Sequence, residues 1–137
     1  MKKDKKSVVF ACVGNSSRSQ MAEAFGKKYL PPGTAIVSAG TKLASKVDPK
    51  TVEVMREVGI DISAQVPKLL TTKMVAGATH FVSMGCGVLE SCPFPLVKGI
   101  NVQDWAFEDT KGKDIGFIRR VRDEIEKRVK AFAEDLR

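Results

Sequence analysis

Few side chains in this sequence can bind a transition metal or form a disulfide. The 137 residues contain three cysteines, Cys12, Cys86 and Cys92, and a single histidine, His80. No CxxC pair is present, which argues against a zinc site. An odd number of cysteines argues against a framework of structural disulfides. We therefore predict no metal centre and no bound cofactor, so that the thiols are catalytic or inert.

Long apolar runs are also absent. The charged residues 1–6 are followed by a short strand-like stretch, not by the longer apolar region and cleavage site of a secretory signal. No stretch is long enough to cross a membrane. We therefore expect a cytoplasmic protein without membrane association, folded as one domain over residues 1–137. We also expect a monomer, because no long exposed apolar stripe stands out.

Aromatic residues are scarce, and Tyr29 is the only tyrosine. Nucleic-acid-binding surfaces often combine clustered basic residues with aromatic side chains, and no such stripe occurs here. The net charge of +7 is instead spread along the chain. We predict no nucleic-acid binding, which leaves an anionic substrate or solubility as explanations of the charge.

Apolar runs alternate with helix-like segments along the chain. The predicted strands are residues 7–13, 34–39, 78–84 and 97–102. One predicted helix starts at Ser19, and three others cover residues 48–59, 71–77 and 114–136. This alternation predicts an α/β fold with a parallel sheet, in which ligands bind at the carboxyl ends of the strands. Cys12 and the loops at 85–95 and 103–112 all follow strands, so we expect them to meet at one edge.

The segment at residues 12–19, CVGNSSRS, carries the strongest functional signal. Its backbone N–H groups can surround an anion at a helix N-terminus, and Arg18 offers a planar fork to two oxygens. The same groups stabilise a thiolate. We predict that Cys12 attacks a tetrahedral oxyanion, although a buried structural cysteine beside a capped helix remains the alternative. The predicted oxyanion-binding residues are Val13, Gly14, Asn15, Ser16, Ser17, Arg18 and Ser19.

Two acids, Glu108 and Asp109, lie in the loop at 103–112. Attack by Cys12 must expel hydroxide or alkoxide, and an acid that protonates this group makes it a viable leaving group. A solvated turn is the alternative, because the sequence Glu-Asp-Thr-Lys-Gly is typical of turns.

Residues 12–25, CVGNSSRSQMAEAF, closely resemble the opening loop and helix of the low-molecular-weight tyrosine phosphatase superfamily, and most of all its thioredoxin-coupled arsenate reductases. The similarity continues through residues 38–40, 47–49, 57–63, 105–112 and 120–125. It implies a four-stranded parallel sheet with helices on both faces.

The resemblance also implies roles for single residues. Cys12 matches the nucleophile, Arg18 the oxyanion clamp and Asp109 the general acid, while Asn15 and Ser19 match residues that shape the loop and support the thiolate. Relatives usually have proline after the acid. The threonine at position 110 therefore predicts a less rigid loop.

In the resembled reductases, the cysteine that matches Cys12 first bonds to arsenic. Cys86 would then attack Cys12 and release arsenite, and Cys92 would attack Cys86. Reduced thioredoxin, or a similar dithiol protein, would finally reduce the Cys86–Cys92 disulfide. The implied substrate is arsenate, with phosphate or sulfate as competing oxyanions.

Two other functions stay open. A phosphatase acting on phosphotyrosine or a small phosphoester needs only Cys12, Arg18 and Asp109, and would leave Cys86 and Cys92 structural or protective. A non-catalytic partner protein could also keep this fold.

A potassium site is a further implication of the resemblance. Asn15, Glu23 and Ser38 match residues that bind potassium in some relatives, but an aspartate of that site falls at Lys68. This departure leaves the cation site in doubt.

Overall fold

Four parallel strands form the sheet around which the described chain is arranged. The computed structural model describes residues 6–85 and 100–137. The strands are β1 (Ser7–Cys12), β2 (Ala35–Gly40), β3 (His80–Ser83) and β4 (Asn101–Asp104), and the helices are α1 (Arg18–Tyr29), α2 (Pro49–Glu57), α3 (Thr72–Ala76) and α5 (Ile115–Leu136).

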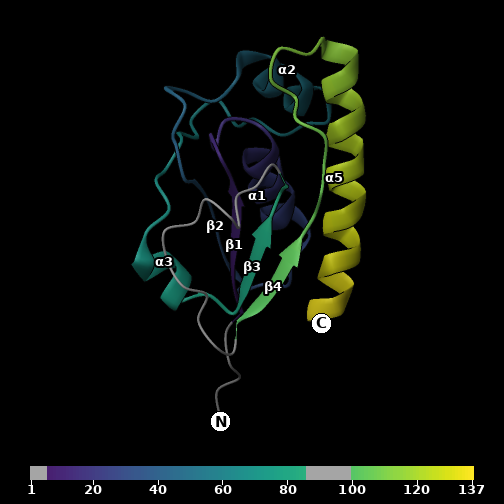
Figure 1. Cartoon of the computed structure of the whole chain (residues 1–137). Helices are drawn as coiled ribbons and strands as arrows, with labels where there is room; N and C mark the ends of the chain where they lie inside the picture. Colours follow the sequence, from purple (N-terminus) through teal and green to yellow (C-terminus); the bar gives the residue numbers. More distant parts are fainter. Residues whose placement is uncertain (1–5, 86–99) are drawn as a thin grey trace.

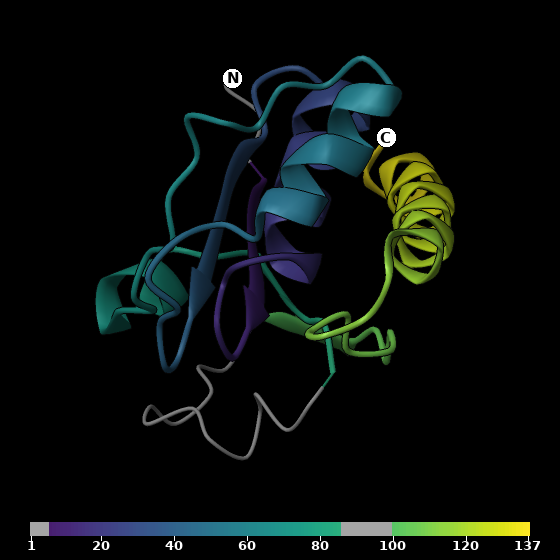
Figure 2. The ribbon, with the colours of Figure 1, turned by 90° about the horizontal axis from the view of Figure 1, so that it is seen from above.

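The strand order is β2-β1-β3-β4, with every pair parallel. Figures 1 and 2 show α1, α2 and α5 on one face of the sheet and α3 on the other. The predicted four-stranded α/β fold with helices on both faces is therefore confirmed. The fourth strand reaches Asp104, two residues beyond its predicted end, because Ser83 of β3 pairs with Asp104.

Strand β1 is buried on both faces, as its continuous apolar run predicts. Val8, Phe10 and Cys12 belong to the larger core under α1, α2 and α5, whereas Val9 and Ala11 belong to the smaller core under α3. The period of two in a strand produces this division. It also places the Cys12 side chain on the α1 side of the sheet.

The long helix α5 closes the larger core. Asp114 caps it by accepting a hydrogen bond from the Phe117 N–H at 2.9 Å. Its buried face consists of Ile118, Val121, Arg122, Ile125, Val129, Phe132 and Ala133. These positions recur at intervals of three and four, which is why the sequence pattern predicts this helix.

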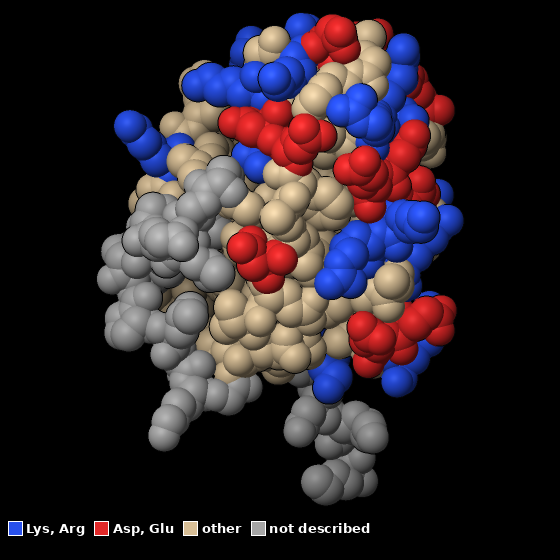
Figure 3. Space-filling model, turned by 45° about the vertical axis from the view of Figure 1, so that its right-hand side comes forward, with Lys and Arg blue, Asp and Glu red and all other residues tan. Residues whose placement is uncertain are grey.

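Polar contacts attach α5 to both neighbouring helices. The Tyr29 hydroxyl of α1 donates to Glu126 at 2.5 Å, and this hydrogen bond raises the pKa of Tyr29 to about 12. The Arg122 guanidinium donates to the Val54 carbonyl and to Glu57 of α2, both at 2.9 Å. On this side of the molecule positive and negative side chains are interspersed (Figure 3).

None of the helices in residues 6–85 and 100–137 combines the length and the apolar character that a membrane crossing requires.

The carboxyl end of β1 lies at the point where the sheet order reverses. Cys12 pairs with Gly40 at the end of β2, while Ala11 pairs with Ser83 at the end of β3. The chain therefore extends to either side of β1, and ligands of parallel α/β sheets bind at such points. Gly40 allows the loop after β1 to pack closely, because a Cβ there would lie 2.6 Å from the Val13 carbonyl oxygen.

The substitution Gly40→Ala should disturb this packing. A methyl group cannot approach a backbone oxygen at 2.6 Å, so the loop after β1 must move. We expect a loss of about 2–3 kcal/mol in the free energy of unfolding, measured by urea denaturation. Gly116→Ala is the control, because its Cβ would make only ordinary contact at 3.6 Å. Equal stability of Gly40→Ala and wild type would contradict the predicted clash.

Candidate active site

The Cys12 thiol lies at the end of β1 and makes hydrogen bonds to the loop that follows and to the first turn of α1. The Asn15 N–H donates to Sγ at 3.2 Å, and the Ser19 hydroxyl lies 2.9 Å from Sγ. The Cys12 residue is 3% exposed. A sulfur with a backbone N–H donor and a hydroxyl within hydrogen-bond distance, at a helix N-terminus, is well suited to carry negative charge.

The side chain of Asn15 contacts the hydroxyl that lies between it and Cys12, that of Ser19. Its Nδ2 donates to the Ser19 oxygen at 2.7 Å, so the Ser19 hydrogen can point to Sγ. Asn15 is fully buried and adopts a left-handed backbone with φ of 52°. Asparagine tolerates this conformation better than most residues, and in it the Asn15 N–H lies within hydrogen-bond distance of Cys12 Sγ.

The prediction that Ser19 caps helix α1 is wrong. The helix begins at Arg18, its N-cap is Ser17, and no side chain makes a capping hydrogen bond. Ser19 lies inside the first turn because its hydroxyl is engaged by Cys12 and Asn15.

The Arg18 guanidinium contacts the segments that follow two other strands, β3 and β4. Its Nη1 donates to the carbonyl oxygens of Met84 at 3.3 Å and Phe107 at 3.0 Å. Its Nη2 lies 3.5 Å from Asp109 Oδ1. Because Arg18 is 6% exposed, these contacts fix a nearly buried cation beside the sulfur.

The structure separates the two acids of the late loop. Asp109 lies in the wall of the same pocket as Cys12 and Arg18, and its side chain is 62% exposed. Glu108 does not line this pocket and instead lies 3.5 Å from Arg120 of α5. Asp109 is therefore the acid that the fold brings to the thiol.

The expectation that Thr110 leaves this loop less rigid is not supported. Thr110 is 1% exposed, and its hydroxyl donates to the Ser17 hydroxyl at 2.8 Å. Ser17 in turn lies 2.7 Å from the Thr51 hydroxyl of α2. This chain of buried hydroxyls attaches the acid loop to the loop after β1, through hydrogen bonds rather than through the fixed backbone of a proline.

The aromatic residues before the acid anchor the same loop in the core. Trp105 is 3% exposed and packs against Phe10 and Phe132, with ring centroids 5.7 and 5.4 Å apart. Phe107 packs edge-on against Trp105 at 6.3 Å. Burial of rings of this size contributes about 2–3 kcal/mol each, which holds the start of the loop in place.

The pocket has a volume of roughly 620 Å³ and a basic rim. Besides Cys12, Arg18 and Asp109, its lining includes Lys42, Lys46 and Lys111. Sequence reasoning missed these lysines because they are scattered and only the fold gathers them. Their charges attract an anionic substrate to the thiol.

The two remaining predicted thiols, Cys86 and Cys92, lie outside the described residues. The described chain reaches Gly85, which has a φ of +93°, and a Cβ at this position would lie 3.3 Å from the Ala106 Cα. Its predecessor Met84 accepts the hydrogen bond from Arg18. The residue that precedes Cys86 in the sequence is therefore held beside the acid loop.

A parallel sheet that presents a hydrogen-bonded thiol, a buried arginine and an aspartate at one pocket defines a cysteine-dependent, phosphatase-like class of enzyme. Residues 7–137 match the family of low molecular weight phosphotyrosine protein phosphatases. The chain belongs to this family.

Named relatives of the chain include arsenate reductases. One from Brevibacillus brevis is 43% identical over 131 residues, covering 96% of both chains. A solved arsenate reductase in the oxidized state is 34% identical, with a TM-score of 0.81 over 96% of this chain and 99% of that one. A thioredoxin-dependent arsenate reductase from Corynebacterium glutamicum is 29% identical, with a TM-score of 0.82, covering 99% of this chain and 64% of its own.

Ser19→Ala should make Cys12 less reactive. The change removes the hydroxyl that lies 2.9 Å from Sγ, and hydrogen bonds to charged groups are worth about 1.5–3 kcal/mol. We expect alkylation of Cys12 by iodoacetamide at pH 7 to slow about tenfold, followed by mass spectrometry of the Cys12 peptide. Ser45→Ala, at an exposed position outside the pocket lining, is the control and should react like wild type. An unchanged rate in Ser19→Ala would show that Ser19 does not support the thiolate.

Thr110→Val tests the chain of hydroxyls. It keeps the shape of the side chain but removes the donor to Ser17, so we expect a loss of about 1–2 kcal/mol in the free energy of unfolding. Thr72→Val, at an exposed position of α3, is the matched control. If both variants unfold at the same urea concentration, the hydrogen bond between Thr110 and Ser17 does not stabilise the fold.

Proposed function

We propose that this chain is a cytoplasmic, monomeric arsenate reductase, with one domain over residues 1–137, that uses Cys12, Cys86 and Cys92 as a thiol relay. The observation that carries the proposal is the supported Cys12 sulfur in a basic pocket beside Arg18 and Asp109. Similarity to named arsenate reductases along nearly the whole chain supports the choice of substrate.

The first step is attack on arsenic. Arsenate enters past the lysines of the rim and binds to the backbone N–H groups of residues 13–19 and to Arg18. The Cys12 thiolate forms a bond to arsenic, and one arsenate oxygen leaves as water after protonation by Asp109. The 62% exposed Asp109 side chain can exchange this proton with solvent.

The next steps transfer two electrons. The Cys86 thiolate attacks Cys12 Sγ, forming a disulfide while the sulfur–arsenic bond breaks and its electron pair stays on arsenic as arsenite. The Cys92 thiolate then attacks Cys86, which releases the Cys12 thiolate. A reduced dithiol protein then reduces the Cys86–Cys92 disulfide, is itself oxidised to a disulfide, and so completes the cycle.

Thioredoxin is the dithiol reductant that we propose, supported by the solved relative that is named as thioredoxin-dependent. No bound cofactor is required, because all electrons pass through thiols. Phosphate and sulfate share the tetrahedral shape and negative charge of arsenate, so we expect both to compete for the oxyanion loop.

Hydrolysis of phosphotyrosine or a small phosphoester is the second candidate function. It is favoured by one observation, the completeness of the Cys12, Arg18 and Asp109 set in a single pocket. A phosphatase needs no further thiol, so Cys86 and Cys92 separate the two reactions.

The substitution Cys92→Ser should stop catalysis after one cycle. With arsenate, thioredoxin, thioredoxin reductase and NADPH, we expect wild type to produce arsenite over many turnovers. The variant should stall near one equivalent, because Cys12 cannot be released from Cys86. Hydrolysis of p-nitrophenyl phosphate, if wild type shows it, should survive in Cys92→Ser. Absence of arsenite from wild type with an active reducing system would instead favour the phosphatase.

A further inference from the structure

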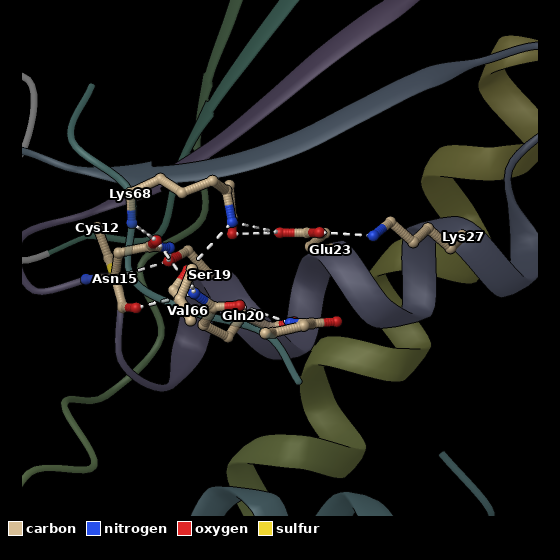
Figure 4. A network of polar contacts seen from close by, with 10 residues as sticks. Cys12, Asn15, Ser19, Gln20, Glu23, Lys27, Val66 and Lys68 are labelled. Atoms are coloured by element: carbon tan, nitrogen blue, oxygen red, sulfur yellow. Dashed lines mark hydrogen bonds and ion pairs between the residues drawn. The ribbon is translucent and has the colours of Figure 1, made fainter. Parts of the chain in front are cut away.

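A buried carboxylate, Glu23 of α1, lies behind the oxyanion loop and takes no part in the proposed chemistry (Figure 4). Glu23 is 4% exposed. Its Oε1 accepts a hydrogen bond from the Ser38 hydroxyl at 2.5 Å and lies 3.5 Å from Lys68 Nζ. Its Oε2 accepts from Lys27 Nζ at 2.7 Å. Two ammonium groups thus face one carboxylate.

These residues do not fit the potassium site that the family resemblance implies. Oxygens of Asn15, Glu23 and Ser38 would have to bind the ion. Asn15 Oδ1 already accepts from the Lys68 N–H at 2.7 Å and from Gln20 Nε2 at 3.0 Å. A cation next to Glu23 would also meet the ammonium of Lys68. The described ranges 6–85 and 100–137 contain no group of three acidic, histidine or cysteine side chains that could hold a metal.

Charge balance in this cluster is complete without an ion. Burial raises the pKa of Glu23, but hydrogen bonds from Lys27 and Ser38 and the charges of Lys68 and Lys27 outweigh it and leave the pKa below its usual value. Glu23 is therefore an ionised carboxylate that needs positive charge nearby, and both lysines provide it.

Lys68 differs from Lys27 in what else it contacts. The Lys68 N–H donates to Asn15 Oδ1 at 2.7 Å, and its carbonyl accepts from the Gly40 N–H at 2.8 Å. Figure 4 shows its side chain extending from Asn15 to Glu23. One residue thereby joins the loop after β1, the end of β2 and helix α1.

The joined residues include those that support the sulfur. Asn15 donates its backbone N–H to Cys12 and its amide to Ser19, which contacts Cys12 in turn. Any shift of Asn15 would therefore weaken both hydrogen bonds to the sulfur.

We propose that the Lys68 ammonium is a built-in replacement for a bound monovalent cation, which pairs with Glu23 and so positions Asn15 and Ser19 to support the Cys12 thiolate. Lys68 is a positioning residue, since it does not line the pocket that holds Cys12. The inference deepens the proposed function by explaining how its nucleophile is supported. The test of this inference needs no arsenate, so its failure is distinguishable from a failure of the proposed arsenate reductase function.

The test is the alkylation rate of Cys12 across pH 5 to 9, in potassium chloride and in choline chloride at equal ionic strength. Wild type should react alike in both salts. Lys68→Ala keeps the backbone bond to Asn15 but removes the ammonium, so in choline its pH midpoint should rise and its rate at pH 7 should fall about fivefold. Potassium, which can take the place of the ammonium beside the oxygens of Glu23 and Ser38, should restore most of the rate and raise Tm by about 2 °C.

Matched variants isolate the charge of Lys68. Lys27→Met removes the other ammonium from Glu23 without touching Asn15, and should stay insensitive to potassium. Lys68→Arg retains the charge and should behave like wild type. Lys68→Gln serves in place of Lys68→Ala should the latter not fold.

Three results would overturn the proposal. The first is stimulation of wild type by potassium, which would mean that a cation binds beside Lys68. The second is a wild-type rate for Lys68→Ala in choline. The third is a slow Lys68→Ala that potassium does not restore, because Lys68 would then act through chain packing and not through its charge.

Discussion

The organisation of this molecule depends on supporting a sulfur atom with polar groups at the end of a buried strand. Cys12 is almost enclosed, and a buried charge is costly unless donors or opposite charges compensate it. The compensation is local: the N–H of Asn15, the hydroxyl of Ser19 and the positive end of α1. Arg18 adds a fixed cation. Donors and charges that are already in place reduce the reorganisation that binding of an anion requires, which favours an oxyanion site.

Around the sulfur, each residue in contact with Cys12 is held in place by further residues that lie farther from the sulfur. Ser19 is oriented by Asn15, and Asn15 by Gln20 and by the backbone of Lys68. The same loop is joined on its other side to the acid loop, through the hydroxyls of Ser17 and Thr110. Cys12 and Asp109 come from distant parts of the sequence, but buried polar groups on both sides of the loop after β1 hold them in one pocket. Such networks are stabilising only when all members are satisfied, and within the described residues no buried side-chain donor or acceptor lacks a partner.

The sequence allowed prediction of those features that depend on local pattern. The apolar run of β1 and the spacing of apolar residues in α5 both predict elements that the structure contains. The presence of Cys12 and Arg18 in one site is predicted by the five residues that separate them in the sequence. Features that depend on long-range contacts were predicted poorly. Ser19 is a residue type that often caps helices, but here its hydroxyl contacts the Cys12 sulfur. Thr110 lies in a sequence typical of turns, but it is buried and hydrogen-bonded to Ser17. The basic rim joins Lys42 and Lys111, which only the tertiary fold brings together.

The network also bears on how one site can serve two reactions. Attack by Cys12 on a phosphoester or on arsenate requires the same thiolate, arginine and acid, and nothing in their geometry distinguishes phosphorus from arsenic. The difference arises after attack, when an intermediate either meets water or meets a second thiol that accepts the sulfur bond. Reduction can therefore be added to a phosphatase fold by changes in the segment after β3, while the support of the thiolate stays constant. In this chain Arg18 contacts both the start of that segment, at Met84, and the acid loop, at Phe107, so the arginine proposed to bind the anion also joins these two parts of the structure.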